Sequence, residues 1–256
     1  MATAVPRFAQ LDAAPDWRTA EFISDLHLQA GEPATFEAWE RYMQATQADA
    51  VFILGDLFEV WVGDDAAGDG TFEGRCAAVL QGTARRTRVF FMHGNRDFLV
   101  GRAFLASLGV TLLDDPTVLL MGGQRWLLSH GDELCLDDVE YLLFRAQVRS
   151  AHWQQEFLAK PLEQRKGIAR GLREQSEALK RSGADYADVD AAAAREWLQE
   201  AQATTLIHGH THKPADHDLG WGMRRVVMSD WDAAATPARM QVLRLSAGNI
   251  QRVAAG

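Results

Sequence analysis

The sequence has few cysteines, no long apolar run and no excess of basic residues. Only two of its 256 residues are cysteines, Cys76 and Cys135, which excludes a disulfide framework and fits a reducing compartment. No apolar run approaches the roughly 18 residues that a membrane-spanning helix needs. The formal net charge of −9 argues against a nucleic-acid partner, because nucleic-acid-binding proteins usually carry a basic surface.

The N-terminal segment MATAVPRFAQLDAAPDW also lacks a basic stretch followed by an apolar one, so we expect no signal peptide and a cytoplasmic location. Apolar residues make up 47% of the chain and charged residues 24%, as in ordinary globular proteins. The length suits one large domain, 1–256, with room for an insert. No feature indicates a protein partner.

Short apolar runs recur along the chain, each bounded by glycine or polar residues. Such runs predict strands in a sheet that is covered on both faces. Helical patterns lie between them, including one with Phe36, Trp39 and Met43 on a single face and others over 102–108 and 189–202. This alternation predicts an α/β fold, closed by a hairpin over 240–253. The predicted strands contain residues 22–23, 51–54, 89–92, 126–128 and 206–207.

About seventy residues separate His130 from the strand before His208, far more than a crossover between strands requires. Residues 137–158 and 161–182 both predict amphipathic helices, so we expect a helical cap over 135–185. From Arg145 to Arg181 there are nine Lys or Arg and four Asp or Glu, a local charge of +5 in an acidic chain.

Polar residues with metal-binding side chains follow five predicted strands in succession. Parallel strands place their carboxyl ends at one sheet edge, where α/β proteins bind ligands. Seven donors exceed the three or four of a single catalytic zinc site, and mixed imidazole and carboxylate donors suit ions such as Mn²⁺, Fe²⁺ or Zn²⁺. The pattern therefore favours two metal ions, with Asp56, in the middle of the series, as a bridging carboxylate. The candidate ligands are Asp25, His27, Asp56, Asn95, His130, His208 and His210.

Each of these residues has a simpler interpretation when taken alone. A strand-end Asp or Asn is commonly a turn residue, and a lone His130 is more often a buried structural histidine. Chance turns have no reason to fall at successive strand ends, which favours the metal site. His212 and His217 lie either near the site or in a polar loop, and the loop is the preferred interpretation. A scaffold that has lost its ions is the non-enzyme alternative, although every ligand position holds a competent donor.

The segments FISDLHL, FILGDLFEVWVGDD, FMHGNRDFLVG, LLSHGDELCLDD and IHGHTHKP, taken in this order, resemble the calcineurin-like metallophosphoesterase superfamily. Within it they are most similar to the diphosphatases of the lipid A pathway, and the similarity includes the helical insert. The resemblance implies a four-layer α/β/β/α sandwich with a cap. It also implies two Mn²⁺ ions, one held by Asp25, His27 and His210 and the other by Asn95, His130 and His208, with Asp56 between them.

The resemblance further implies a substrate and a location. The reaction would be hydrolysis of the diphosphate bond of UDP-2,3-diacylglucosamine, by attack of hydroxide on the α-phosphorus, to UMP and 2,3-diacylglucosamine 1-phosphate. The lipid substrate implies peripheral attachment to the cytoplasmic face of the inner membrane. The alternative is a related phosphodiesterase that acts on nucleotides. Substrate contacts are expected from Asn95, Arg96, Asp138, Tyr141, Ser176, Lys180 and His208.

Arg96 supports a diphosphate substrate on chemical grounds. Many relatives have histidine at this position, where it can protonate a leaving alkoxide, whereas arginine stays protonated and cannot act as a general acid. Arginine can stabilise charge on a transferring phosphoryl group, and a sugar phosphate leaves without needing a proton. The alternative is that Arg96 only forms a surface ion pair with Asp97. Likewise, the basic cap either contacts acyl chains and a membrane surface or is an ordinary solvated helical face.

Overall fold

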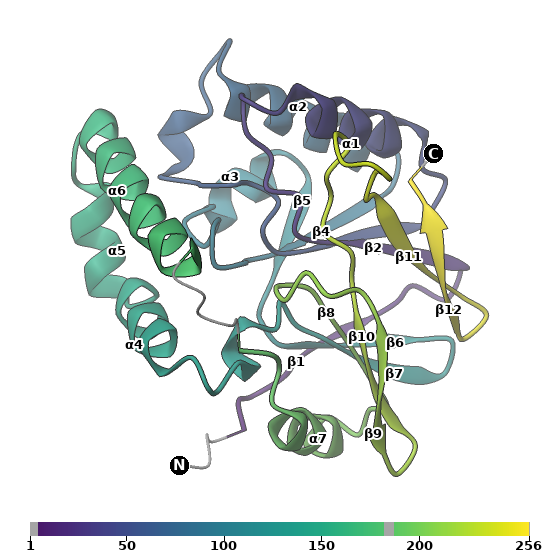
Figure 1. Cartoon of the computed structure of the whole chain (residues 1–256). Helices are drawn as coiled ribbons and strands as arrows, with labels where there is room; N and C mark the ends of the chain where they lie inside the picture. The colour runs from purple at the N-terminus through teal and green to yellow at the C-terminus, as the bar shows by residue number, and fades with distance from the viewer. Residues whose placement is uncertain (1–4, 182–186, 256) are drawn as a thin grey trace.

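The structure is a computed structural model that describes the backbone of residues 5–181 and 187–255, and the side chains of these residues except 174–181 (Figure 1). Its strands form two six-stranded sheets. The first sheet has the order β12-β11-β2-β3-β4-β5. Its strands are β2 (Thr19–Ile23), β3 (Ala50–Leu54), β4 (Arg88–Met92), β5 (Val110–Leu113), β11 (Gln241–Ser246) and β12 (Asn249–Ala254).

The second sheet has the order β1-β6-β7-β8-β10-β9. The neighbours β7, β8 and β10 are parallel, while β6 and β9 run antiparallel to their partners β7 and β10. In the first sheet β2 to β5 are all parallel, so their carboxyl ends lie at one edge. The strands of the second sheet are β1 (Ala9–Asp12), β6 (Thr117–Met121), β7 (Gln124–Leu128), β8 (Thr205–His208), β9 (Asp216–Gly220) and β10 (Met223–Val227).

The helices and strands form four layers (Figure 1), and three apolar cores lie between these layers. One core lies between the first sheet and α1 (Pro33–Ala45) and α2 (Phe72–Ala84), and it includes α3 (Arg102–Ser107). A second lies between the sheets, and a third between the second sheet and α7 (Ala191–Glu200). Successive side chains of a strand point to opposite faces: Ile53 joins the first core and its neighbour Phe52 the second. The predicted α/β/β/α sandwich is therefore confirmed.

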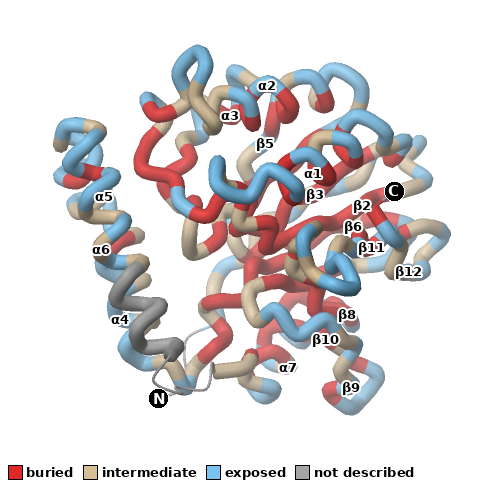
Figure 2. Tube along the Cα trace, turned by 45° about the horizontal axis from the view of Figure 1, so that its top comes forward, coloured by how far each residue is buried: buried red, intermediate tan, exposed pale blue. Residues whose placement is uncertain are grey.

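The cap consists of α4 (Val139–Val148), α5 (Ala151–Leu158) and α6 (Leu162–Arg181), which lie to one side of the sheets (Figures 1 and 2). The prediction of one continuous helix over 137–158 was wrong. Ser150 has an extended backbone, and its hydroxyl accepts a hydrogen bond from the Trp153 amide at 3.3 Å. A serine in this role begins a new helix, which separates α4 from α5. Among the described residues, no helix is both long and apolar enough to cross a bilayer.

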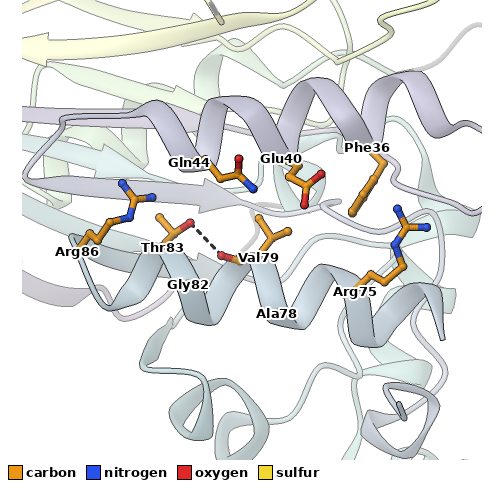
Figure 3. A pocket seen from close by; sticks show the side chains of 9 residues that line it. All are labelled: Phe36, Glu40, Gln44, Arg75, Ala78, Val79, Gly82, Thr83 and Arg86. Atoms are coloured by element: carbon orange, nitrogen blue, oxygen red, sulfur yellow. Dashed lines mark hydrogen bonds between the residues drawn. The ribbon is translucent and has the colours of Figure 1, made fainter. Parts of the chain in front are cut away.

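A groove of about 410 Å³ runs between α1 and α2 on the outer face of the first sheet (Figure 3). Arg75 lies over the Phe36 ring at one end of it, and Arg86 donates to the Met43 carbonyl oxygen near the other. None of the predicted site residues lines this groove. The groove is therefore separate from the site predicted at the strand ends.

Candidate metal centre

The polar residues predicted at the ends of β2, β3, β4 and β7 gather at one place between the two sheets. Backbone hydrogen bonds extend the pairing of β2 and β3 beyond the strands, because the amides of Leu26 and His27 both donate to the Asp56 carbonyl oxygen. The amide of His210 donates to the Asp25 carboxylate at 2.9 Å and so attaches the chain after β8 to the same point. The convergence predicted from the strand ends is thus observed for these residues.

One group of ligand atoms comes from Asp25, His27 and His212, which lie within 4.8 Å of one another. The Nε2 atoms of the two imidazoles are 3.1 Å apart, and Nε2 of His212 is 3.4 Å from Oδ1 of Asp25. His212 was expected in a polar loop, and the structure places it in this group instead. The sequence signal was its spacing, two residues after His210 in HGHTH.

A second group contains Asp25, Asp56 and His130. Nε2 of His130 lies 3.8 Å from Oδ1 of Asp56 and 3.0 Å from Oδ1 of Asn95. Nδ1 of His210 is also 3.0 Å from the same Asn95 oxygen. Asp56 lies between the two groups, since its other oxygen is 3.9 Å from Nε2 of His27.

His208 does not belong to either group among the described residues. Its ring is fully buried, with Nδ1 2.9 Å from the Gly209 carbonyl oxygen and Nε2 3.4 Å from the Arg225 guanidinium. Arg225 is in turn held by both carboxylate oxygens of Asp188. Both ring nitrogens of His208 thus have protein partners, as those of His130 do. The roles of His208 and His210 as ligands stay predictions, and the structure adds His212 as a further candidate beside Asp25 and His27.

The centre fits divalent cations. The carboxylates of Asp25 and Asp56 are buried, and neither has a Lys or Arg ion-pair partner among the described side chains. Buried charges in proteins are normally paired or bound to metal ions. Burial alone would lower the pKa of His130, but the nearby Asp56 and Asp132 carboxylates outweigh it and raise that pKa to about 9. The centre therefore attracts positive charge.

Asp97 and Gly94 hold Asp56 in place. Asp97 is fully buried and accepts hydrogen bonds from the amides of Gly94 and Leu57, each at 2.8 Å. It does not pair with Arg96, so the surface ion pair considered from the sequence is absent among the described contacts. Gly94 allows the close approach, because a β-carbon there would lie 2.1 Å from Oδ1 of Asp56.

Arg96 and Glu59 lie beside the first group of ligand atoms. The amide of Arg96 donates to Oδ1 of Asp56 at 2.8 Å, and the Nη1 atom of its guanidinium lies 3.8 Å from Oε1 of Glu59. Its buried Nε has no hydrogen-bond partner among the described residues. Burial would raise the pKa of Glu59, but His27, Arg96 and Arg173 lower it below its usual value. Sequence reasoning missed Glu59.

The cap contributes side chains at the other edge of the centre. The Tyr141 hydroxyl and Nε of Arg145 both donate to the fully buried Asp132 carboxylate, and the Tyr141 ring stacks on His210 with centroids 5.9 Å apart. Asp138 caps α4 by accepting from the Tyr141 amide at 3.0 Å. The side chains of Ser176 and Lys180, on α6, lie outside the described part of the structure.

The calcineurin-like phosphoesterase family matches residues 22–214. This match spans most of the chain and all of the metal centre, and the chain therefore belongs to the calcineurin-like phosphoesterases. The family resemblance predicted from the sequence motifs is confirmed.

Several closely similar relatives are named UDP-2,3-diacylglucosamine hydrolase. The protein of that name from Chromobacterium violaceum is 48% identical over 219 residues, which cover 82% of this chain and 89% of the relative. The one from Chromohalobacter salexigens is 44% identical over 220 residues, covering 83% and 89%. The Ralstonia nicotianae protein is 45% identical over 240 residues, covering 89% of each chain.

Proposed function

We propose that this chain hydrolyses the diphosphate bond of UDP-2,3-diacylglucosamine and releases UMP and 2,3-diacylglucosamine 1-phosphate. The observation that carries the proposal is the pair of ligand groups joined by Asp25 and Asp56 beside the cap. Relatives named UDP-2,3-diacylglucosamine hydrolase match this chain over 82–83% of its length. A centre that holds cations and one arginine beside a phosphate group suits hydrolysis of a diphosphate.

Two Mn²⁺ ions per chain are proposed at this centre. Asp25, His27 and His210 would hold one ion, and Asp56 would be shared between the two. Cations held there would withdraw charge from phosphate oxygens and lower the pKa of water. The second ion would be held by Asn95, His130 and His208.

Arg96 would bind the diphosphate beside the ions. Its side chain is one-fifth exposed, which leaves part of it open to a phosphate oxygen. Because Arg96 keeps its proton, it stabilises charge without donating a proton to the leaving group. A departing sugar phosphate needs no such proton, since its second pKa is about 6. The absence of a general acid at this position thus favours cleavage of an anhydride over a simple alkyl ester.

The cap over 135–185 would bind the rest of the substrate. Tyr141 is held by Asp132 and stacks on His210, so its ring faces the diphosphate end of the site. Asp138 positions Tyr141 by capping α4. Ser176 and Lys180 are proposed as further substrate contacts on α6.

The cap would also attach the protein to the cytoplasmic face of the inner membrane. Val139 and Leu143 lie four residues apart on one face of α4 and are 60% and 69% exposed. Leu158 on α5 and Leu172 on α6 are exposed as well. Apolar side chains next to Lys and Arg favour an anionic lipid surface.

The test is UMP release from UDP-2,3-diacylglucosamine with Mn²⁺ present. We expect turnover by the native chain and a loss of at least about 100-fold in Asp56→Ala, which removes the shared ligand. A nucleotide phosphodiester is assayed in parallel. Turnover of that compound without UMP release from the acylated sugar nucleotide would overturn the proposed substrate, and full activity of Asp56→Ala would overturn the proposed centre.

A further inference from the structure

Glu59 joins three parts of the molecule that meet at the metal centre. Its Oε2 lies 3.1 Å from Nδ1 of His27. Its Oε1 lies 3.8 Å from Nη1 of Arg96 and 3.2 Å from Nε of Arg173, which is on the cap helix α6. One carboxylate therefore touches a proposed metal ligand, the proposed phosphate-binding arginine and the cap.

The backbone brings Glu59 to this position. The β2–β3 pairing continues past the strands through a bridge between Leu28 and Phe58. The Glu59 amide then donates to the Leu28 carbonyl oxygen at 3.1 Å. Because Leu28 directly follows His27, this register places the Glu59 side chain against the outer side of the His27 ring. The carboxylate is only 11% exposed, so water screens it little.

We infer that Glu59 is a positioning residue that orients His27 toward the metal centre and couples the cap to it through Arg96 and Arg173. An imidazole that faces a carboxylate through one nitrogen presents the other as a lone-pair donor. Here Nδ1 lies 3.1 Å from Oε2 of Glu59, and Nε2 lies 3.9 Å from Oδ2 of Asp56 and 3.1 Å from Nε2 of His212. The second oxygen of Glu59 holds two arginines that would otherwise repel each other.

The first step of the test measures Mn²⁺ binding by calorimetric titration of the full-length metal-free protein. Removal of a carboxylate that orients a ligating histidine typically costs 10- to 100-fold in metal affinity. We therefore expect Glu59→Ala to weaken binding of one of the two ions by about 10- to 100-fold. Glu59→Gln keeps an oxygen for Nδ1 of His27 and should recover most of that affinity. An affinity of Glu59→Ala within about threefold of the native value would overturn the inference.

A matched control separates this role from a loose cap. Asp65 also pairs with a cap residue, Arg165 of α6, but touches no proposed metal ligand. Asp65→Ala should therefore leave Mn²⁺ affinity within about twofold of the native value. A loss in Asp65→Ala equal to that in Glu59→Ala would assign the effect to cap docking and overturn the role of His27.

A double-mutant cycle tests whether Glu59 acts through His27. In a His27→Ala background, Glu59→Ala should cause no further loss of Mn²⁺ affinity, because the two effects share one path. An additional tenfold loss would contradict the inference. The cycle also detects misfolding of Glu59→Ala, because a misfolded chain would lose Mn²⁺ affinity in both backgrounds.

The coupling to the cap rests on the proposed function and is read from kinetics at saturating Mn²⁺. Both Glu59→Ala and Glu59→Gln should raise KM for the acylated sugar nucleotide, because neither side chain holds the arginines by charge. An unchanged KM in both variants would contradict this part. If the native protein released no UMP at all, the proposed function would fail, while the Mn²⁺ titrations would still decide the role of Glu59.

Discussion

Several residues of the metal centre have a backbone conformation that residues with a β-carbon rarely adopt. The φ angles of Asp25, His27, Asp56, His210 and His212 lie between 48° and 66°. A non-glycine residue in this region costs on the order of 1–2 kcal/mol, and such a cost persists only where neighbouring contacts fix the backbone. Here the fixing contacts include the bonds from Leu26 and His27 to the Asp56 carbonyl. The fold thus orients the candidate ligand side chains toward one another.

The assignment of the three histidines of HGHTH is open to a direct test. We expect His208→Ala and His210→Ala each to reduce Mn²⁺ from two ions per chain to one, because each removes one proposed ligand. His212→Ala should retain both ions, since it leaves every proposed ligand in place. Elemental analysis after dialysis measures all three variants. Two ions in His208→Ala, or one in His212→Ala, would instead assign a ligand role to His212, which lies beside Asp25 and His27.

Gly94 gives a second prediction for a single residue. In Gly94→Ala the new β-carbon would lie 2.1 Å from Oδ1 and 2.3 Å from the amide nitrogen of Asp56. Overpacking of this kind typically costs 1–3 kcal/mol, which should appear as a lower free energy of unfolding in urea for the metal-free protein. Gly82→Ala, on α2, meets no atom within 4 Å and should stabilise by up to about 1 kcal/mol. Equal stability of the two variants would contradict the packing argument.

At this scale the sequence predicted most of the centre but not its details. Strand-end position identified Asp25, His27, Asp56, Asn95 and His130, which the structure brings together. It did not single out His212, which the structure places beside Asp25 and His27. Glu59 gave no signal, since its position depends on the Leu28–Phe58 bridge, a contact between segments about 30 residues apart.

At the scale of elements, predictability followed burial only in part, since β6 and β10 are largely buried and were not predicted. The central strands β2, β3, β4, β7 and β8 are apolar on both faces and were predicted. The edge strands β1 and β9 were not, because they alternate intermediate and exposed residues and read as loops. Helix α2 was also missed, since Gly74, Gly82 and Thr83 weaken its helical pattern. Thr83 nevertheless fits, because its hydroxyl donates to the Val79 carbonyl one turn earlier.

Docking of α6 depends on a buried arginine. Arg165 is 3% exposed, and its guanidinium donates to the Val62 carbonyl and pairs with Asp65. Its Nε also donates to the Lys160 carbonyl at 3.0 Å. The side chain therefore attaches the start of α6 to the loop after β3, which also carries Asp56 and Glu59.

We expect Arg165→Ala to leave the Val62 carbonyl unpaired and to destabilise the docked cap by about 1–3 kcal/mol. Hydrogen exchange of the α6 amides should then accelerate roughly 5- to 150-fold, with the sheets unaffected. Lys166→Ala is the matched control, because Lys166 forms only an exposed pair with Glu163 and such pairs contribute little. Equal protection of α6 in the two variants would show that Arg165 does not dock the cap.

For the whole molecule, the fold places the metal centre and the exposed apolar residues at different parts of the surface. The strands β2, β3, β4, β7 and β8 lead into the metal centre, and the cap lies beside it (Figure 1). The exposed apolar residues of α4 are on the cap, whereas Trp221, which is 81% exposed, is on the turn between β9 and β10. The proposed membrane contact therefore has two separate candidate surfaces, and the charge of the cap favours the first.

Binding to vesicles that contain anionic lipids distinguishes these surfaces. Burial of a leucine or valine side chain contributes about 1.5–3 kcal/mol, and a carboxylate near anionic lipid is repelled. The double variant Val139→Glu/Leu143→Glu should therefore bind such vesicles at least about 100-fold more weakly than the native chain. Trp221→Ala should bind within about twofold of the native value. Added salt should weaken the native interaction, because it screens the attraction between the basic cap and the lipid headgroups. Loss of binding in Trp221→Ala alone would instead place the membrane contact at the hairpin, on a surface that does not carry the cap.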